Sequence, residues 1–172
     1  EREAEVLNFN GLQIIYSNPK SPASVVTRVL RSYGESYLSD KVHGIEFQYA
    51  TDGFFQVNLP VYEQALDRMR KWVIDATPVL DFYSGVGTIG LTIDASDVTL
   101  VEQNEVCINE MQRNVRRIGS KARIVHASAE KALDIITGKE VVVVDPPRAG
   151  LHDEADSRGH RVHRSLPDGD RV

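Results

Sequence analysis

The sequence of 172 residues contains a single cysteine, Cys107, and no long apolar run. One cysteine excludes an internal disulfide framework and a cysteine-based metal cluster within this chain. A membrane-spanning helix needs about 20 consecutive apolar residues, and no segment approaches that length. Residues 1–5 also lack the basic start and the apolar core of a signal peptide. We therefore expect a cytoplasmic protein.

A surplus of positive charge is missing as well. The chain has 20 Lys and Arg against 25 Asp and Glu, a formal net charge of −5. Nucleic-acid-binding proteins usually carry a basic face, because contacts with phosphate supply most of their affinity. We interpret the cations near residue 118 as ordinary charges at a helix end rather than an RNA contact: Arg113, Arg116, Arg117, Lys121 and Arg123. A nucleic-acid substrate would have to be held mainly by another module.

Histidines that could bind a metal lack suitable neighbours. His43 and His126 have no Cys or His partners at ligand spacing, so we expect no metal site. No internal repeat is visible, the length fits one domain, and we favour a monomer.

The two ends of the chain differ in pattern from its middle. Residues 1–50 are interpreted as an N-terminal α+β segment, which begins with a hairpin turning at Asn10–Gly11. A helix over residues 21–34 and a strand over residues 45–49 are expected to follow. Residues 151–172 are charged and irregular, and we interpret them as disordered. An α/β domain would normally continue here, so the fold is expected to be incomplete at its C-terminus.

Residues 51–150 are predicted to form the core. A helix begins at Pro60, and its buried side carries either Val61, Ala65, Met69 and Trp72 or Leu66 and Val73. Strands and helices then alternate, with strands over residues 79–83, 98–101, 123–125 and 141–144. Continuous apolar strands are typical of parallel sheets covered by helices on both faces. The fold class is therefore α/β, a Rossmann-like doubly wound and mostly parallel sheet.

A glycine motif follows the first of these strands. Gly85-x-Gly87-x-x-Gly90 comes directly after the strand and opens a helix, which is the context of a nucleotide-binding turn. Nicotinamide cofactors and S-adenosylmethionine both use such a turn. Both also require an acid at the end of the second strand to accept ribose hydroxyls, and Glu102 stands there. The glycine motif alone leaves the two cofactors open.

The segment Asp145-Pro146-Pro147-Arg148 favours one of them. The two prolines remove two N–H donors and stiffen the chain directly after a strand. They would hold the Asp145 carboxylate and nearby carbonyls around a planar group at the edge of the sheet. Methyltransferases that act on bases often need such a feature, whereas nicotinamide enzymes do not. The aromatic cluster at residues 54–58 is interpreted as packed side chains followed by Asn58 as a helix cap.

Together these motifs resemble the RNA (uracil-5-)-methyltransferase family of class I S-adenosylmethionine-dependent enzymes. The resemblance covers residues 10–151 and rests on Phe55-Gln56-Val57-Asn58, Asp81 to Thr88, Glu102 and Asp145 to Leu151, in this order. It implies a class I methyltransferase core that binds S-adenosylmethionine and acts on rRNA or tRNA. The expected cofactor contacts are Gln56, Tyr83, Gly85, Gly87, Thr88, Glu102 and Asp145. Thr88 replaces an Asn that is common in some members.

The family's chemistry implies further residues. A Cys thiolate adds to C6 of uracil, C5 takes the methyl group, and a carboxylate removes the C5 proton. The resemblance places that Cys and the Glu base beyond the Asp-Pro-Pro-Arg segment, and neither is found in this chain. Cys107 lies on a helix and is interpreted as a small buried residue. We therefore assign no catalytic residue.

Three hypotheses remain open at this point. The chain is the cofactor-binding core of a 5-methyluridine-forming RNA methyltransferase, or a methyltransferase that modifies amino groups of guanine or adenine. In the third hypothesis the chain is a binding module that has lost catalysis. A nicotinamide dehydrogenase is a distant fourth.

Overall fold

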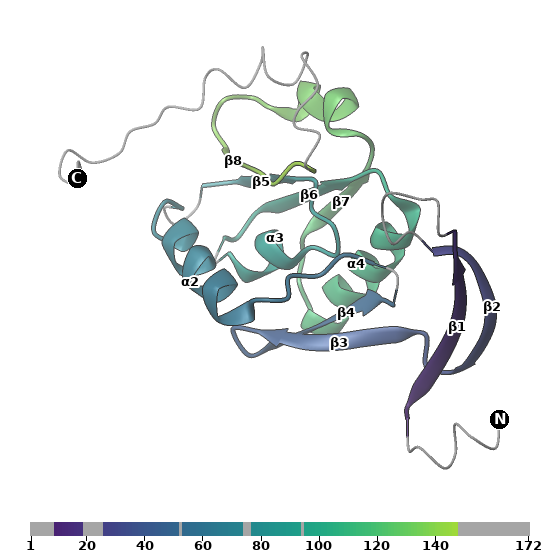
Figure 1. Cartoon of the computed structure of the whole chain (residues 1–172). Helices are drawn as coiled ribbons and strands as arrows, with labels where there is room; N and C mark the ends of the chain where they lie inside the picture. The colour runs from purple at the N-terminus through teal and green to yellow at the C-terminus, as the bar shows by residue number, and fades with distance from the viewer. Residues whose placement is uncertain (1–8, 19–25, 52, 74–76, 94, 148–172) are drawn as a thin grey trace.

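The computed structural model describes residues 9–18, 26–51, 53–73, 77–93 and 95–147 (Figure 1). Its centre is a parallel sheet made of β5 (Val79–Phe82), β6 (Val98–Glu102), β7 (Arg123–His126) and β8 (Val141–Val144). The strands lie in the order β7-β6-β5-β8. After β5, the chain adds β6 and β7 on one side of that strand and then returns to add β8 on its other side. All paired strands in this sheet are parallel, which confirms the Rossmann-like prediction.

Helices cover both faces of this sheet (Figure 1). One face carries α2 (Leu59–Arg70), α3 (Thr88–Thr92) and α4 (Glu105–Ile118). The other face is covered by η1 (Ala129–Ile135), a 3₁₀ helix that stands where the alternating pattern predicted a helix between the last two strands. Alternate residues of β5 therefore enter two different cores, with Val79 on the α3 side and Leu80 on the η1 side. The prediction that these strands are buried on both faces is confirmed for β5 and β6.

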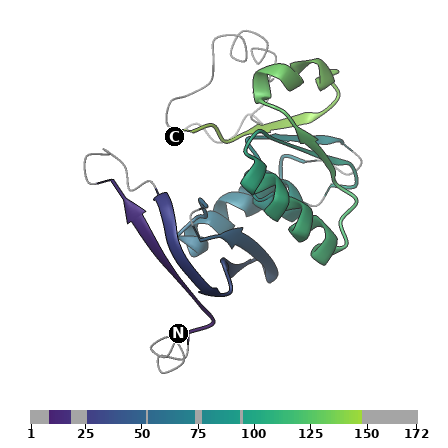
Figure 2. The ribbon, with the colours of Figure 1, turned by 90° about the vertical axis from the view of Figure 1, so that its right-hand side faces the viewer.

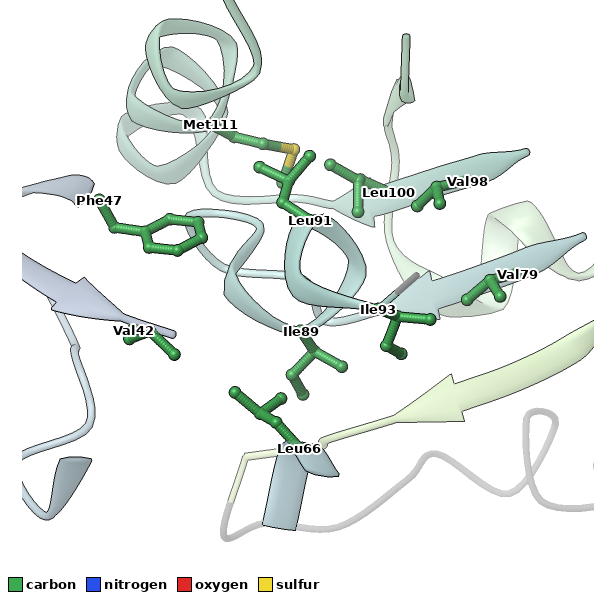
Figure 3. Close-up of a cluster of buried hydrophobic side chains, with 10 residues drawn as sticks. All are labelled: Val42, Phe47, Leu66, Val79, Ile89, Leu91, Ile93, Val98, Leu100 and Met111. Atoms are coloured by element: carbon green, nitrogen blue, oxygen red, sulfur yellow. The ribbon is translucent and has the colours of Figure 1, made fainter. Parts of the chain in front are cut away.

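The larger core lies between the sheet and α3. Figure 3 shows Phe47, Leu66 and Met111 pointing toward α3 from three different elements. The apolar face of α4 was correctly predicted to end at Gly119, which has a positive φ of 71° and caps the helix. Of the two faces considered for α2, the one with Leu66 is correct, because Val61 and Trp72 are 58% and 63% exposed.

The N-terminal segment differs from the prediction. The expected helix is a strand over its described part, because β2 (Val26–Gly34) pairs in antiparallel fashion with β1 (Gly11–Ser17). The β-branched side chains of this segment suit a strand as well as the helical spacing that was inferred from them. The hairpin expected at Asn10–Gly11 would use residues before Phe9 that lie outside the described part of the chain, so it stays a prediction. In the structure Asn10 and Gly11 lie at the open end of the β1–β2 ribbon, where the Glu35 N–H donates to the Asn10 carbonyl.

A second hairpin joins this ribbon to the core. It consists of β3 (Tyr37–Val42), which the sequence analysis missed, and β4 (Ile45–Ala50), which it predicted. Val42 and Phe47 of this hairpin belong to the same core as α3, whereas the β1–β2 ribbon projects to one side (Figure 2). The division of the chain at residue 50 stays a prediction. The expectations for Arg148 and residues 151–172 lie outside the described residues, and no described helix is long and apolar enough to cross a membrane.

Gly90 allows α3 to approach the sheet closely. A Cβ atom at this position would lie 2.3 Å from Leu100 Cδ2 and 3.1 Å from Val98 Cγ1. Leu100 is completely buried, so moving its side chain aside would disturb the packed core around it. The third glycine of the motif therefore serves helix–sheet packing.

We expect Gly90→Ala to lower the free energy of unfolding by about 1–3 kcal/mol, because it overpacks this contact. Leu100→Ala removes the clashing atom, so the double variant should lose clearly less stability than the sum of the two single variants. Urea denaturation of all four proteins measures this. Simple additivity of the two losses would contradict the close contact.

Candidate cofactor-binding site

Three adjacent strands of the sheet, β6, β5 and β8, end together at its carboxyl edge. Phe82 of β5 lies opposite Val101 of β6 and Val144 of β8. Tyr83, Glu102 and Asp145, three of the residues expected to contact the cofactor, come directly after these positions. The structure therefore brings them to the carboxyl edge at the β5/β8 switch point, where open α/β sheets bind their ligands.

The glycine turn between β5 and α3 requires unusual backbone angles. Tyr83, Gly85 and Gly87 have φ values of 60°, 56° and 89°. A Cβ on Gly85 would meet no atom within 4 Å, so this residue faces open space and leaves its backbone accessible to a ligand. Gly87 is packed instead, because a Cβ there would lie 3.0 Å from Leu91 Cδ1. Thr88, the first residue of α3, is buried.

Glu102 links the glycine turn to the end of β6. Its Oε2 accepts a hydrogen bond of 2.9 Å from the Gly85 N–H. Its Oε1 accepts from the N–H groups of Gln103 and Asn104 at 2.9 and 2.8 Å. A carboxylate offers about four acceptor positions, so this one is held rigidly by backbone donors and retains capacity for a hydroxyl.

Asp81 is a completely buried acid beneath the turn. Its Oδ2 accepts from the Gly90 N–H at 2.9 Å, while its Oδ1 has no hydrogen-bond partner among the described residues. Burial raises the pKa of this carboxyl to about 7; the Gly90 N–H opposes the shift, and the charges of Asp145 and Glu102 add to it. Tyr62 on α2 also has a raised pKa, mainly because it is buried and further because of the negative charges of Asp81 and Asp145.

Gln56 lies in the segment between β4 and α2, separate in sequence from the glycine turn. Phe55 stacks on Tyr49 of β4 with ring centroids 4.3 Å apart, and Asn58 caps α2 by accepting from the Val61 N–H. Packed aromatic and capping roles are therefore confirmed for these two residues. Phe54 is exposed, so the aromatic packing does not extend to it.

Three residues that position the site were not identified from the sequence. Asp81 stands in the strand before the glycine turn and Tyr62 in α2, and no local pattern in the sequence indicates a role for either residue. Asn114 of α4 is fully buried and bonds to both β4 and the glycine turn. A signal existed for Asn114, because a polar residue three positions after Met111 falls on the apolar face of the helix.

A parallel sheet with a switch point, a glycine turn and an acid ending the second strand fit the core of a class I methyltransferase, and the comparisons with known proteins favour this class over a nicotinamide-binding domain. A family model described as "Conserved hypothetical protein 95" matches residues 61–156, more than half of the chain. The chain belongs to this family. Its relatives also confirm the resemblance to the RNA (uracil-5-)-methyltransferases that was recognised in the sequence.

An uncharacterized RNA methyltransferase of Protochlamydia amoebophila is 32% identical over 141 residues, which cover 78% of this chain and 37% of the relative. A 23S rRNA (uracil(747)-C(5))-methyltransferase of Pyrococcus horikoshii is 32% identical over 87% of this chain and 37% of its own length. The crystal structure of Pyrococcus abyssi tRNA (uracil-54, C5)-methyltransferase with S-adenosyl-L-homocysteine matches with a TM-score of 0.73. The match has 27% identity and covers 88% of this chain and 38% of that one. The chain thus spans little more than a third of these relatives.

The buried acid predicts a pH-dependent stability. The pKa of Asp81 is about 7 in the folded protein against an ordinary value of 3.8, so the folded state favours the protonated form. Its contribution to stability is complete below pH 3.8 and is lost as the pH rises through 7. The wild type should therefore lose on the order of 1–3 kcal/mol of its free energy of unfolding between pH 5 and pH 8. Asn resembles the neutral acid, so Asp81→Asn should not show this loss.

Denaturant unfolding of the wild type and of Asp81→Asn at both pH values measures this difference. Asp97→Asn, a change at an exposed acid, serves as the control and should keep the wild-type pH dependence. An equal loss of stability in Asp81→Asn and in the wild type would show that Asp81 does not titrate in this range.

Proposed function

We propose that this chain forms the S-adenosylmethionine-binding part of an RNA (uracil-C5)-methyltransferase. The hydrogen bond from the Gly85 N–H to Glu102 Oε2 is the observation that carries the proposal. This bond places Gly85, whose backbone is open to a ligand, beside the acid that would accept the ribose hydroxyls. The similarity to uracil-C5 methyltransferases, one of them solved with S-adenosyl-L-homocysteine, supports the same ligand.

The charge of the site fits this cofactor. S-adenosylmethionine carries a positive sulfonium and a positive ammonium group, and Asp81, Glu102 and Asp145 are close enough for their charges to influence one another. The unpartnered Oδ1 of Asp81 is a buried acceptor that a cation or an N–H donor would satisfy. An anionic ligand such as a dinucleotide pyrophosphate would be repelled by the charges of Glu102 and Asp145, and also by Asp81 in its ionised form.

Each expected contact has a role in this proposal. Glu102 accepts the ribose hydroxyls, Gly85 lets the cofactor approach the backbone, and Gly87, which is packed against Leu91, shapes the turn that faces the cofactor. Tyr83, Thr88 and Gln56 surround the cofactor from the turn, from α3 and from the segment before α2. Asp145 stands where the methyl donor meets the base. When bound, the cofactor supplies an electrophilic methyl group, and the protein residues orient it.

The RNA substrate belongs to the same proposal. Methyl transfer to C5 of uracil requires a thiolate that adds to C6, and no residue of this chain is assigned that part. Cys107, which lies in α4, is only partly buried. The chain alone is therefore expected to bind the cofactor without forming 5-methyluridine. A cytoplasmic location and a monomeric state remain proposals of the same kind.

Calorimetry with S-adenosylmethionine and S-adenosylhomocysteine tests the cofactor assignment. We expect both to bind, and Glu102→Gln to weaken binding about tenfold or more, because the amide NH₂ of Gln opposes the backbone donors that now hold the carboxylate. Glu105→Gln, a change at an exposed acid in the first turn of α4, is the matched control and should bind as the wild type does. Absence of binding to either ligand, or tight binding of NAD instead, would refute the assignment.

Transfer of a labelled methyl group to bulk RNA, followed by nucleoside analysis, tests the reaction. We expect no 5-methyluridine from this chain. Methylated guanine or adenine would instead support the hypothesis that the enzyme modifies base amino groups.

A further inference from the structure

Asn114 makes three hydrogen bonds although its side chain has no exposed surface. Its Oδ1 accepts from the Gln48 N–H at 2.8 Å, and its Nδ2 donates to the Gln48 carbonyl at 2.9 Å. The same Nδ2 also donates to the Val86 carbonyl at 3.1 Å. The amide therefore uses both of its donor hydrogens and one acceptor position in a buried environment, where each bond is costly to lose.

The two bonds to Gln48 replace the pairing of a further strand. Gln48 lies in β4, which pairs with β3 along one edge only. Asn114 offers the other edge a carbonyl and an N–H, as a neighbouring strand would do. This interaction fixes β4 to the middle of α4, and β4 leads directly into the segment that carries Gln56.

The third bond reaches the glycine turn itself. Val86 stands between Gly85 and Gly87, so a fixed Val86 carbonyl fixes the peptide plane that joins Val86 to Gly87. The adjacent Gly87 N–H donates to the Ser84 carbonyl at 2.8 Å and closes the turn. Since glycines tolerate many conformations, a turn rich in glycine needs such external support to keep one shape.

We propose that Asn114 is a positioning residue of the cofactor site, which holds the glycine turn and the Gln56-bearing segment in one arrangement. It touches neither cofactor nor substrate and acts through the Val86 carbonyl and the backbone of β4. The effect on cofactor affinity rests on the proposed function. The effect on the shape of the turn does not.

The test compares Asn114→Ala and Asn114→Asp with Val79→Ala. Asn114→Asp keeps nearly the same shape and still accepts from Gln48, but its oxygen faces the Val86 and Gln48 carbonyls. It keeps the volume of the side chain, so it tests the two donated hydrogen bonds without the cavity that Asn114→Ala leaves. Val79 is fully buried at the opposite, amino end of β5, so Val79→Ala serves as a control for a general loss of stability.

Two measurements are made on each protein. We expect the Asn114 variants to bind S-adenosylhomocysteine about tenfold more weakly, and Val79→Ala to bind it within about twofold of the wild type. We also expect amide hydrogen exchange at Gly87 to accelerate selectively in the Asn114 variants, and only in proportion to global stability in Val79→Ala.

Hydrogen exchange separates the possible failures. Exchange at Gly87 could accelerate selectively in the Asn114 variants while the wild type binds neither S-adenosylmethionine nor S-adenosylhomocysteine. That result would refute the proposed function and leave Asn114 as the support of the turn. Asn114 variants that follow Val79→Ala in exchange and in affinity would overturn the positioning role.

Discussion

The close approach of α3 to β5 and β6 is the constraint on which the site depends. It requires a residue without a side chain at position 90, because Leu100 occupies the space where a Cβ would lie. The approach also brings the Gly90 N–H to Asp81 Oδ2, so a buried acid of β5 anchors the helix. Since the chain must turn sharply between that strand and that helix, residues 83–87 take positive φ values at three positions. The shape of the turn thus follows from packing below it.

The turn is then held from two other directions. Glu102 binds the Gly85 N–H from the end of β6, and Asn114 binds the Val86 carbonyl from α4. Both bonds use groups of the turn that no regular secondary structure would satisfy. A ligand that binds there meets backbone groups already fixed in place, which lowers the entropic cost of binding.

Much of the fold followed from the sequence, because its parallel strands are continuous apolar runs and its helices have glycine or asparagine at their ends. The residues at the sheet edge were found for the same reason, since strand ends fix their position. The β1–β2 ribbon was missed, because its valines are spaced as on a helix and only pairing with β1 decides their conformation. The sequence does not predict the roles of Asp81, Tyr62 and Asn114, because these roles depend on contacts between distant elements. No local pattern encodes a bond from residue 114 to residue 48.

The distribution of charge is compatible with the proposed role, in which an acidic chain binds the cofactor of a reaction on RNA. The site gathers three acids, of which Asp81 has a pKa raised to about 7, and this acidic environment suits a cationic methyl donor better than a phosphate. Several cations that could have met RNA are engaged with acids of the chain itself. Arg117 pairs with Glu46 at 2.8 Å, Arg113 with Glu110 at 2.8 Å and Arg123 with Asp97 at 3.4 Å. These pairs engage three of the five cations near the end of α4 with acids of the same surface. In the proposed enzyme, cofactor binding is therefore local to this core, and the grip on a polyanionic RNA must come from groups other than these paired arginines.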